Sequence, residues 1–275
     1  MSVSTPPTPA AVRAAETLAE AERTGIPCPP VRKLFASDDL DTAYAAQRVN
    51  TEHALAAGRR VVGRKIGLTS PAVQAQLGVG QPDFGVLFAD MAVPDGGEVP
   101  AGRLLQPKVE AEVALVLGSD LPHRDCTLAD VLRATDFVLP ALEIVDSRVE
   151  NWDISITDTI ADNASSGLFV LGGPLRLLAD LDLRGVTMTM SRGGTEVSTG
   201  SGTDCLGSPL NAAVWLASTL AAMGDPLRAG DIVLTGALGP MAPAAPGDAF
   251  LADVTGLGSV SVRFAPATAP ERTSA

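Results

Sequence analysis

Residues 106–117, QPKVEAEVALVL, decide the fold because they have the pattern of a buried β-strand and yet carry two glutamates. Side chains alternate across a strand, so Glu110 and Glu112 share one face, roughly 6–7 Å apart along it. The opposite face is apolar, with Val109, Ala111, Val113 and Leu115. Carboxylates on a mostly apolar strand are costly unless a partner neutralises them or they stay protonated. The stretch therefore predicts a functional site as well as a core strand.

A second apolar run, FVLPALEIVDSR at residues 137–148, contains Glu143. Three glutamates on apolar strands are explained by a divalent cation held by hard oxygen ligands, with further positions left for water or substrate. The alternative is that each glutamate pairs with a basic side chain. The partners available for such pairs are Lys108, Arg148 and Arg64. Spacing alone leaves both readings open.

Lys65 and Asp83 are further candidates for chemistry. In GRKIGLTS, Lys65 shares a strand face with two glycines, which let a ligand approach the ammonium closely. A desolvated lysine can act as an acid or base near neutral pH, whereas a lysine at a strand end commonly lies at the surface. In QPDFGVLFADM, Pro82 and Gly85 place Asp83 in a turn, where an aspartate ordinarily stabilises the turn.

Composition restricts the class of protein. The 275 residues are 46% hydrophobic, enough for one large domain or a domain with a helical appendage. The net charge of −12 and the lack of a basic stripe argue against a nucleic-acid partner. Three widely spaced cysteines indicate reduced thiols. With no signal-peptide pattern and no apolar run as long as a membrane span, we expect a soluble, cytoplasmic protein without membrane contact.

The order of the patterns predicts a helical beginning followed by a β-rich body. Thr8-Pro9 can start a helix, and a second helix is expected from Ser37 or Asp38 to Gly58. From residue 61 short apolar or β-branched runs follow, interrupted by one strong helix over residues 209–223. We therefore expect a helical part at 1–60, a catalytic β-rich domain at 61–264, and a disordered tail at 265–275.

Several familiar motifs are absent. The letters D-F-G at Asp83 lack the other kinase motifs, and GSGTDCLG has the wrong glycine spacing for a dinucleotide site. The two histidines, His53 and His123, neighbour no nucleophile motif. A Ser-His-Asp hydrolase and a histidine-ligated zinc enzyme are therefore poorly supported.

Taken together, several blocks resemble the 2-keto-4-pentenoate hydratase (2-hydroxypenta-2,4-dienoate hydratase) group of the fumarylacetoacetate hydrolase superfamily. The blocks run in order between residues 35 and 264. They are GRRVVGRKIGLTS, LGVGQPDFGVLFADM, LLQPKVEAEVALVLG, VLPALEIVDSR, DTIADNASSG, CLGSPLNAAVWLA and GDIVLTGALGPM. The resemblance implies an α+β fold, with a fumarylacetoacetate-hydrolase-like mixed β-roll core, flanking helices and a small helical N-terminal part.

The resemblance also assigns roles to residues. It implies Mg²⁺ or Mn²⁺ held by Glu110, Glu112 and Glu143. The active-site lysine of the family falls on Lys65 and its acid/base aspartate on Asp83. The resemblance also implies that Ser165, in the polar segment DTIADNAS, contacts the substrate. Members form rings of five or ten subunits, so a homo-oligomer is expected, as is association with a downstream aldolase.

The implied reaction is metal-dependent addition of water to a small-molecule 2-hydroxydienoate in the meta-cleavage catabolism of aromatic compounds. Protonation at C5 of 2-hydroxypenta-2,4-dienoate and addition of water at C4 give 4-hydroxy-2-oxopentanoate. Two related alternatives are a 4-oxalocrotonate decarboxylase and a hydratase of a longer 2-oxo-dienoate diacid. A non-catalytic partner of a sister enzyme is a third, which the intact set of site residues argues against.

Overall fold

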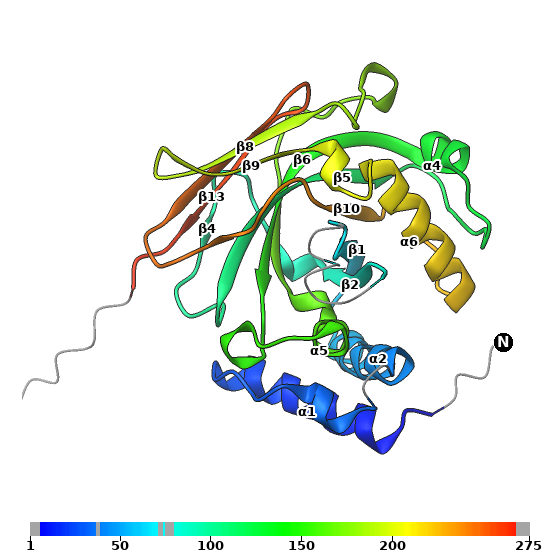
Figure 1. Cartoon of the computed structure of the whole chain (residues 1–275), viewed down its shortest axis with the longest axis vertical. Coiled ribbons are helices and arrows are strands. Elements are labelled where there is room, and N and C mark those ends of the chain that lie inside the picture. The colour runs from blue at the N-terminus through cyan, green and yellow to red at the C-terminus, as the bar shows by residue number, and fades with distance from the viewer. Residues whose placement is uncertain (1–5, 37–38, 71–73, 75–79, 268–275) are drawn as a thin grey trace, which may run out of the picture.

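The computed structural model describes residues 6–36, 39–70, 74 and 80–267. Figure 1 shows two β-sheets above a group of N-terminal helices, with further helices at one side. The larger sheet has eight strands, in the order β2-β1-β10-β5-β6-β7-β3 with β11 added to β5, and the smaller has the order β4-β13-β12-β8-β9. The result is a mixed α+β architecture, as expected. The division predicted at residue 60 stays a prediction. The disordered tail was predicted for residues 265–275, and residues 268–275 of it lie outside the described part.

The N-terminal helices begin and end where local chemistry predicts. Helix α1 (Pro9–Thr24) has Thr8 as its N-cap, with Thr8 Oγ1 accepting from Ala11 N, and Gly25 in the left-handed conformation as its C-cap. Helix α2 (Leu40–Ala56) is capped by Asp39, while the predicted start at Ser37 or Asp38 lies outside the described residues. Alanines on both helices form a closely packed second core beside the main one.

The larger sheet joins segments that are far apart in the chain. Its strands are β1 (Val61–Gly67), β2 (Asp83–Phe88), β3 (Ala92–Val93), β5 (Pro107–Leu117), β6 (Thr135–Asp146), β7 (Ser166–Leu171), β10 (Ile232–Ala237) and β11 (Ala242–Pro243). The pairs β1–β10 and β3–β7 are parallel and the other pairs antiparallel. Because β10 lies between β1 and β5, it connects the strand of Lys65 to the strand of Glu110 and Glu112.

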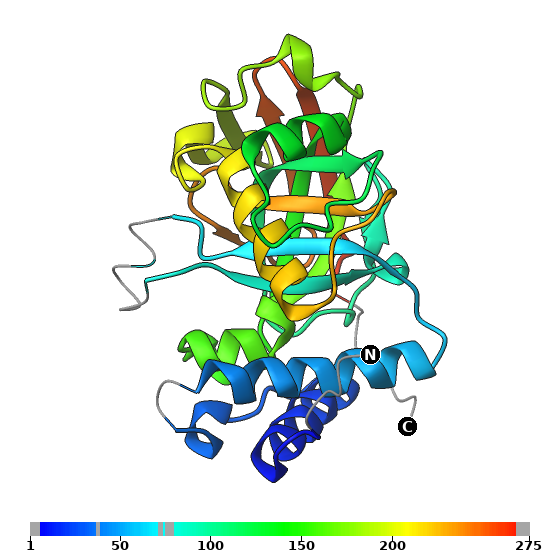
Figure 2. The same ribbon diagram turned by 90° about the vertical axis from the view of Figure 1, so that its right-hand side faces the viewer.

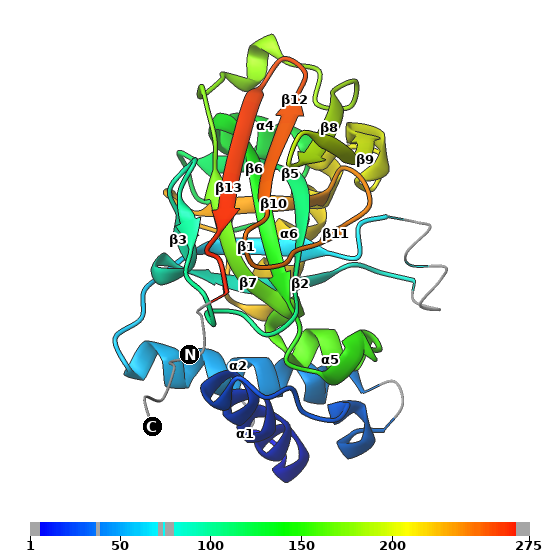
Figure 3. The ribbon, with the colours of Figure 1, turned by 90° about the vertical axis from the view of Figure 1, so that its left-hand side faces the viewer.

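The smaller sheet packs over β6 and completes the core. Its strands are β4 (Glu98–Val99), β8 (Thr187–Arg192), β9 (Thr195–Ser201), β12 (Ala249–Val254) and β13 (Gly258–Phe264). Burial alternates strictly along β12, as it does in a sheet with one face in the core and one face in water. Phe250 and Phe264 meet edge to face inside, with ring centroids 5.9 Å apart. Figure 3 shows β12 and β13 lying across the strands of the larger sheet.

Three further helices flank the sheets. They are α4 (Leu128–Ala134), α5 (Ile156–Ala161) and α6 (Pro209–Met223). The described residues also form short 3-10 turns, which are η1 (Val31–Leu34), η2 (Ala89–Met91), η3 (Glu150–Trp152), η4 (Asn163–Ser165), η5 (Leu178–Asp180) and η6 (Gly202–Asp204). The predicted helix over residues 209–223 is confirmed as α6, while α4 and α5 were not predicted because each has fewer than two turns. Figure 2 shows α5 between α2 and the strands.

The apolar character of α6 comes from its place in the core. Within the described residues the helical segment Gly202–Met223 is long and apolar enough to cross a membrane, with a mean hydropathy of 1.2, so the expectation that no run is long enough was wrong. However, 44% of that window is buried inside the fold. Ala212, Leu216 and Leu220 are buried, and α6 packs on β10. Core helices of soluble proteins pass the same test, so it is weak evidence of a membrane span.

Candidate metal centre and active site

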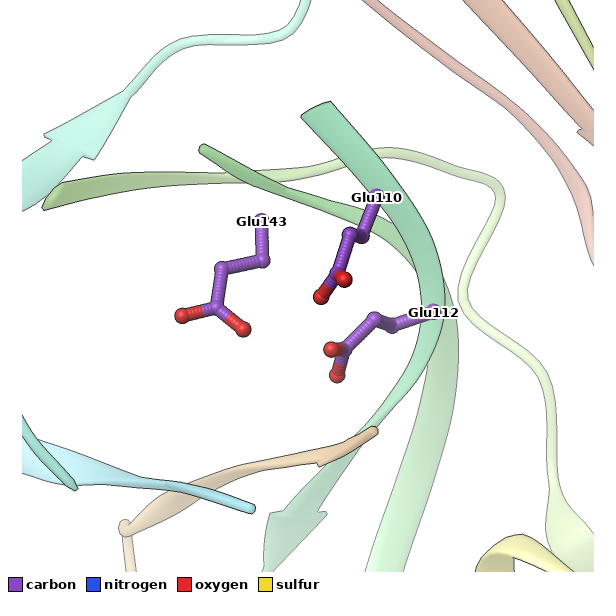
Figure 4. A group of neighbouring side chains, drawn as sticks. All are labelled: Glu110, Glu112 and Glu143. Atoms are coloured by element: carbon purple, nitrogen blue, oxygen red, sulfur yellow. The ribbon is translucent and has the colours of Figure 1, made fainter. Parts of the chain in front are cut away.

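The three glutamates meet on neighbouring strands. Glu110 on β5 lies directly opposite Glu143 on β6, and Glu112 follows Glu110 on the same face. One carboxylate oxygen from each lies within 4.8 Å of the others, and Figure 4 shows the three carboxylates turned toward one another. Glu112 and Glu143 are buried. The two-residue alternation predicted this shared face, and the pairing of β5 with β6 adds the third member.

These carboxylates lie in an environment that is poor in hydrogen bonds. Glu112 Oε2 accepts from Gly236 N at 2.8 Å, but Glu112 Oε1 has no hydrogen-bond partner among the described residues. Burial, followed by the charge of Glu143, raises the pKa of Glu110 to about 7 and the pKa of Glu112 well above its usual range. A hard cation would satisfy these oxygens and offset the repulsion. The donor set therefore fits Mg²⁺ or Mn²⁺.

Lys65 lies inside the protein, beside the cluster. On β1 it is only 3% exposed, so the reading as a surface lysine was wrong. Lys65 Nζ lies 3.0 Å from Glu143 Oε1, an ion-pair distance, although the angles fall outside hydrogen-bond geometry. Burial lowers the pKa of Lys65, but the charges of Glu143 and Asp83 outweigh it and leave the pKa above its usual value. This shift favours the ammonium form of the side chain.

Asp83 faces the same space from strand β2. It begins the strand opposite Gly67, so its expected place in a turn was wrong. Neither of its carboxylate oxygens has a hydrogen-bond partner among the described residues, since the nearby Thr159 hydroxyl falls outside that geometry. Burial raises the pKa of Asp83, and Lys65 and Thr159 oppose the shift only in part. A β-carbon at Gly67 would collide with Asp83 Oδ1 and lie 3.6 Å from Lys65 Nζ, so glycine allows the two groups to converge.

Ser165 lies in the turn η4, between α5 and β7. Its side chain is buried, and Ser165 Oγ lies 3.4 Å from Thr159 Oγ1. Thr159 in turn neighbours Asp83. The segment predicted to contact substrate therefore lies beside the acid/base candidate.

The alternative in which each glutamate pairs with a basic residue is not what the structure shows. Arg148 binds Asp162, and Arg64 binds Asp225. Lys108 Nζ lies 4.0 Å from the centroid of the Trp152 ring. Arg148 and Arg64 are thus engaged elsewhere, and Lys108 acts on Glu110 only through its charge. Among the described residues, the ion pair with the cluster is made by Lys65.

One contributor to the site, Gly236, was missed from sequence. Gly236 donates its backbone N–H to Glu112 and has a φ of 107°, with Thr69 packed where a β-carbon would be. It lies at an irregularity in the register between β10 and β5. A glycine inside the strand pattern DIVLTGALG indicates a bulge or a close approach, and that was the available signal.

Over most of its length the chain is similar to known proteins. Residues 44–265 match the C-terminal fumarylacetoacetate hydrolase family. The chain is 61% identical over 252 residues to 2-keto-4-pentenoate hydratase 2 of Dechloromonas aromatica strain RCB, which covers 92% of this chain and 96% of that protein. It is 53% identical over 251 residues to 2-keto-4-pentenoate hydratase of Paraburkholderia xenovorans strain LB400. That alignment covers 91% of this chain and 93% of that protein.

A solved structure has the same fold. It is 4-oxalocrotonate decarboxylase from Pseudomonas putida G7, complexed with magnesium and adipate. The TM-score is 0.89 at 38% sequence identity, covering 92% of this chain and 97% of that chain. This likeness confirms the mixed β-roll fold with N-terminal helices that the resemblance of the sequence implied.

Proposed function

The chain belongs to the fumarylacetoacetate hydrolase family, and on that premise we propose a metal-dependent hydratase that converts 2-hydroxypenta-2,4-dienoate (2-keto-4-pentenoate) into 4-hydroxy-2-oxopentanoate. The reaction belongs to the meta-cleavage breakdown of aromatic compounds. The observation that carries the proposal is a cluster of three glutamates, of which the two buried ones have oxygens without a hydrogen-bond partner among the described residues, beside a buried lysine and aspartate.

The glutamates Glu110, Glu112 and Glu143 would hold the cation, Mg²⁺ or Mn²⁺. A bound cation of this kind supplies a Lewis acid that stabilises negative charge on the enol oxygen of the substrate. The N–H of Gly236 fixes one carboxylate of the set, since Glu112 Oε2 accepts from it. The solved decarboxylase that resembles this chain contains magnesium, which supports the same class of metal here.

Lys65 and Asp83 are proposed to move the protons. Hydration requires that the enol O–H lose its proton, that C5 gain one, and that water give hydroxide to C4 and a proton to C3. Both side chains are buried and converge above Gly67, so they can reach one bound molecule from the same side. Ser165 is proposed to contact the substrate from the neighbouring turn. Burial of these groups excludes bulk water from the proton transfers.

The decarboxylase alternative is less well supported. The decarboxylase structure is 38% identical to this chain, whereas the two hydratases are 53% and 61% identical. A non-catalytic role is disfavoured because all five charged site residues are present and buried together or clustered.

We also propose a cytoplasmic homo-oligomer, a ring of five or ten subunits that associates with a downstream aldolase. The three cysteines are free and buried, which suits a reducing compartment. Light scattering of the purified protein, alone and with the aldolase, tests the assembly.

The test of the function uses the purified protein freed of metal with EDTA. We expect it to be inactive on 2-hydroxypenta-2,4-dienoate, and added Mg²⁺ or Mn²⁺ to restore the ultraviolet loss of the dienol. Parallel assays with 4-oxalocrotonate measure released CO₂. Full activity without metal would end the metal proposal, and rapid CO₂ release with little hydration would favour the decarboxylase.

A further inference from the structure

Strand β2 lies at one edge of the larger sheet, and side chains from other elements cover its open side. Val86 N donates to Asn163 Oδ1 at 2.7 Å, and Asn163 Nδ2 donates to Val86 O at 3.0 Å. The neighbouring outward carbonyl, Phe84 O, accepts from Gln47 Nε2 at 2.9 Å. The amide of Asn163 therefore pairs with the edge as another strand would.

The turn that carries Asn163 has an unusual backbone. Asn163, Ala164 and Ser165 have φ values of 55°, 52° and 53°, the left-handed region. Asparagine tolerates this region, but alanine and serine do not favour it, and each such residue costs on the order of 1 kcal/mol or more. Three in succession persist only where the surroundings hold them in place.

A buried arginine holds both ends of this turn. Arg148 Nη2 donates to Asp162 O at 2.6 Å, and Arg148 Nη1 donates to Ser166 O at 2.8 Å. The guanidinium is also ion-paired with the carboxylate of Asp162. Arg148 thus fixes the ends of the turn, while Asn163 fixes its middle to β2.

The turn lies on the face of β2 that carries the chemistry. Gly85 is paired with Lys65 across the strands, and a β-carbon at Gly85 would collide with Asn163 O. Glycine at this position therefore lets the turn rest on the strand. The same turn carries Ser165, and the same strand begins with Asp83.

We propose that Asn163 is a positioning residue of this active site, a role that rests on the proposed function. Its side-chain amide locks the turn of Ser165 to the strand of Asp83, so the hydroxyl and the carboxylate keep one relative position during the reaction. Asn163 acts through the backbone of Val86. A misplacement of about 1 Å at a distance from the chemistry costs up to about 10²-fold in rate.

The two hydrogen bonds between the Asn163 side chain and the Val86 backbone are called the clamp. The variant Asn163→Gly separates the effect of the clamp from the effect of the backbone conformation at residue 163. Glycine adopts the positive φ freely, so the turn keeps its shape at lower strain while the two hydrogen bonds to Val86 are lost. We expect kcat to fall about 10–100-fold, with KM for the dienoate and the affinity for Mn²⁺ nearly unchanged. We also expect the Val86 amide to exchange its hydrogen at least about 10-fold faster, a readout independent of activity.

Asn151→Gly is the matched control, since Asn151 is an exposed asparagine with a φ of 58°. It should keep kcat and the exchange rate of Val86. Asn163→Asp is the second variant: its carboxylate still accepts from Val86 N but cannot donate to Val86 O. We expect an intermediate loss of kcat, and this variant carries the test if the glycine variant fails to fold.

The outcomes distinguish the two proposals. A wild-type protein that does not hydrate the dienoate overturns the proposed function, while the exchange of Val86 still reports on the clamp. A wild-type protein that hydrates it, together with Asn163→Gly at the wild-type kcat, overturns the positioning role and leaves the function standing. Equal loss in Asn163→Gly and Asn151→Gly would also overturn it.

Discussion

Glu112 bears much of the electrostatic cost of the site, because its carboxylate is completely buried and accepts a single hydrogen bond within the described structure. Replacing it by glutamine keeps the shape and removes the charge. Replacing a residue that only hydrogen-bonds to a metal ligand typically costs about 10-fold or more in metal affinity. We therefore expect Glu112→Gln, which changes a proposed ligand itself, to lose Mn²⁺ affinity by at least about 10-fold, and we expect the same of Glu110→Gln. The metal-free variants should be as stable as the parent or slightly more so.

Isothermal titration with Mn²⁺ and thermal unfolding measure these two effects. Glu196→Gln is the control for the loss of one negative charge, because Glu196 is exposed and lies on the smaller sheet. Wild-type metal affinity and turnover in the Glu110 and Glu112 variants would mean that the paired glutamates serve the structure alone.

Substitutions at Lys65 test whether the residue transfers a proton or only supplies a positive charge. We expect Lys65→Ala to bind metal but to lose about 10²–10⁴ in turnover, the usual scale for a positioned acid or base. Arginine at this position should not restore the rate, because a guanidinium is not deprotonated in proteins, whereas a lysine ammonium can release its proton. Steady-state kinetics with parallel metal analysis measures this, with exposed Lys33→Ala as control.

Near wild-type turnover in Lys65→Arg would show that the residue supplies only positive charge, as its contact with Glu143 also permits. Asp83 would then be left as the main group for proton transfer.

At the scale of elements, helix α2 is tied to the catalytic sheet by one buried amide. Gln47 Nε2 donates to Phe84 O and to Ile160 O, so it joins α2 to both β2 and α5. Gln47→Ala leaves two buried carbonyls without this donor. We expect the free energy of unfolding to fall by roughly 2–6 kcal/mol, at about 1–3 kcal/mol for each unsatisfied group.

Urea unfolding measures the loss. The neighbouring exposed residue on the same helix, changed as Arg48→Ala, is the control. If both variants were equally stable, the helical part would be attached to the sheet by apolar packing alone.

Elements with strong local signals were predictable from sequence. Thr8 and Pro9 begin α1, Pro209 begins α6 and Gly224 ends it, because capping and proline preferences are set by neighbouring residues. Alternation likewise predicted that Glu110 and Glu112 share a face. Short helices such as α4 and α5 offer too few turns for a periodic pattern to emerge.

What depends on distant contacts was not predictable. The left-handed turn at residues 163–165 is contrary to the preferences of alanine and serine, and it exists because Arg148 and Val86 hold it. Asp83 looked like a turn residue because Gly85 looked like a turn glycine, but Gly85 is needed for the close approach of Asn163. These are the positions where tertiary structure overrides local preference.

At the scale of the whole molecule, metal binding should stabilise the fold. A ligand that binds only the folded state, at a free concentration of about 100 times its Kd, adds about 2.7 kcal/mol to the free energy of unfolding. For a chain of this size we expect saturating Mg²⁺ or Mn²⁺ to raise Tm by about 5–10 °C. Differential scanning calorimetry measures the shift, which should be smaller in Glu112→Gln at the same metal concentration. An equal shift in both proteins would place the bound ion elsewhere.

The position of β10 between β1 and β5 also determines when the site can exist. Every side chain proposed for metal binding or catalysis lies between Lys65 and Ser165, yet the strand that joins the lysine to the glutamates is Ile232–Ala237. During synthesis the ribosome has therefore released all the chemical groups long before the strand that unites them. A message truncated just before residue 232 would encode a complete set of reactive residues and no assembled centre.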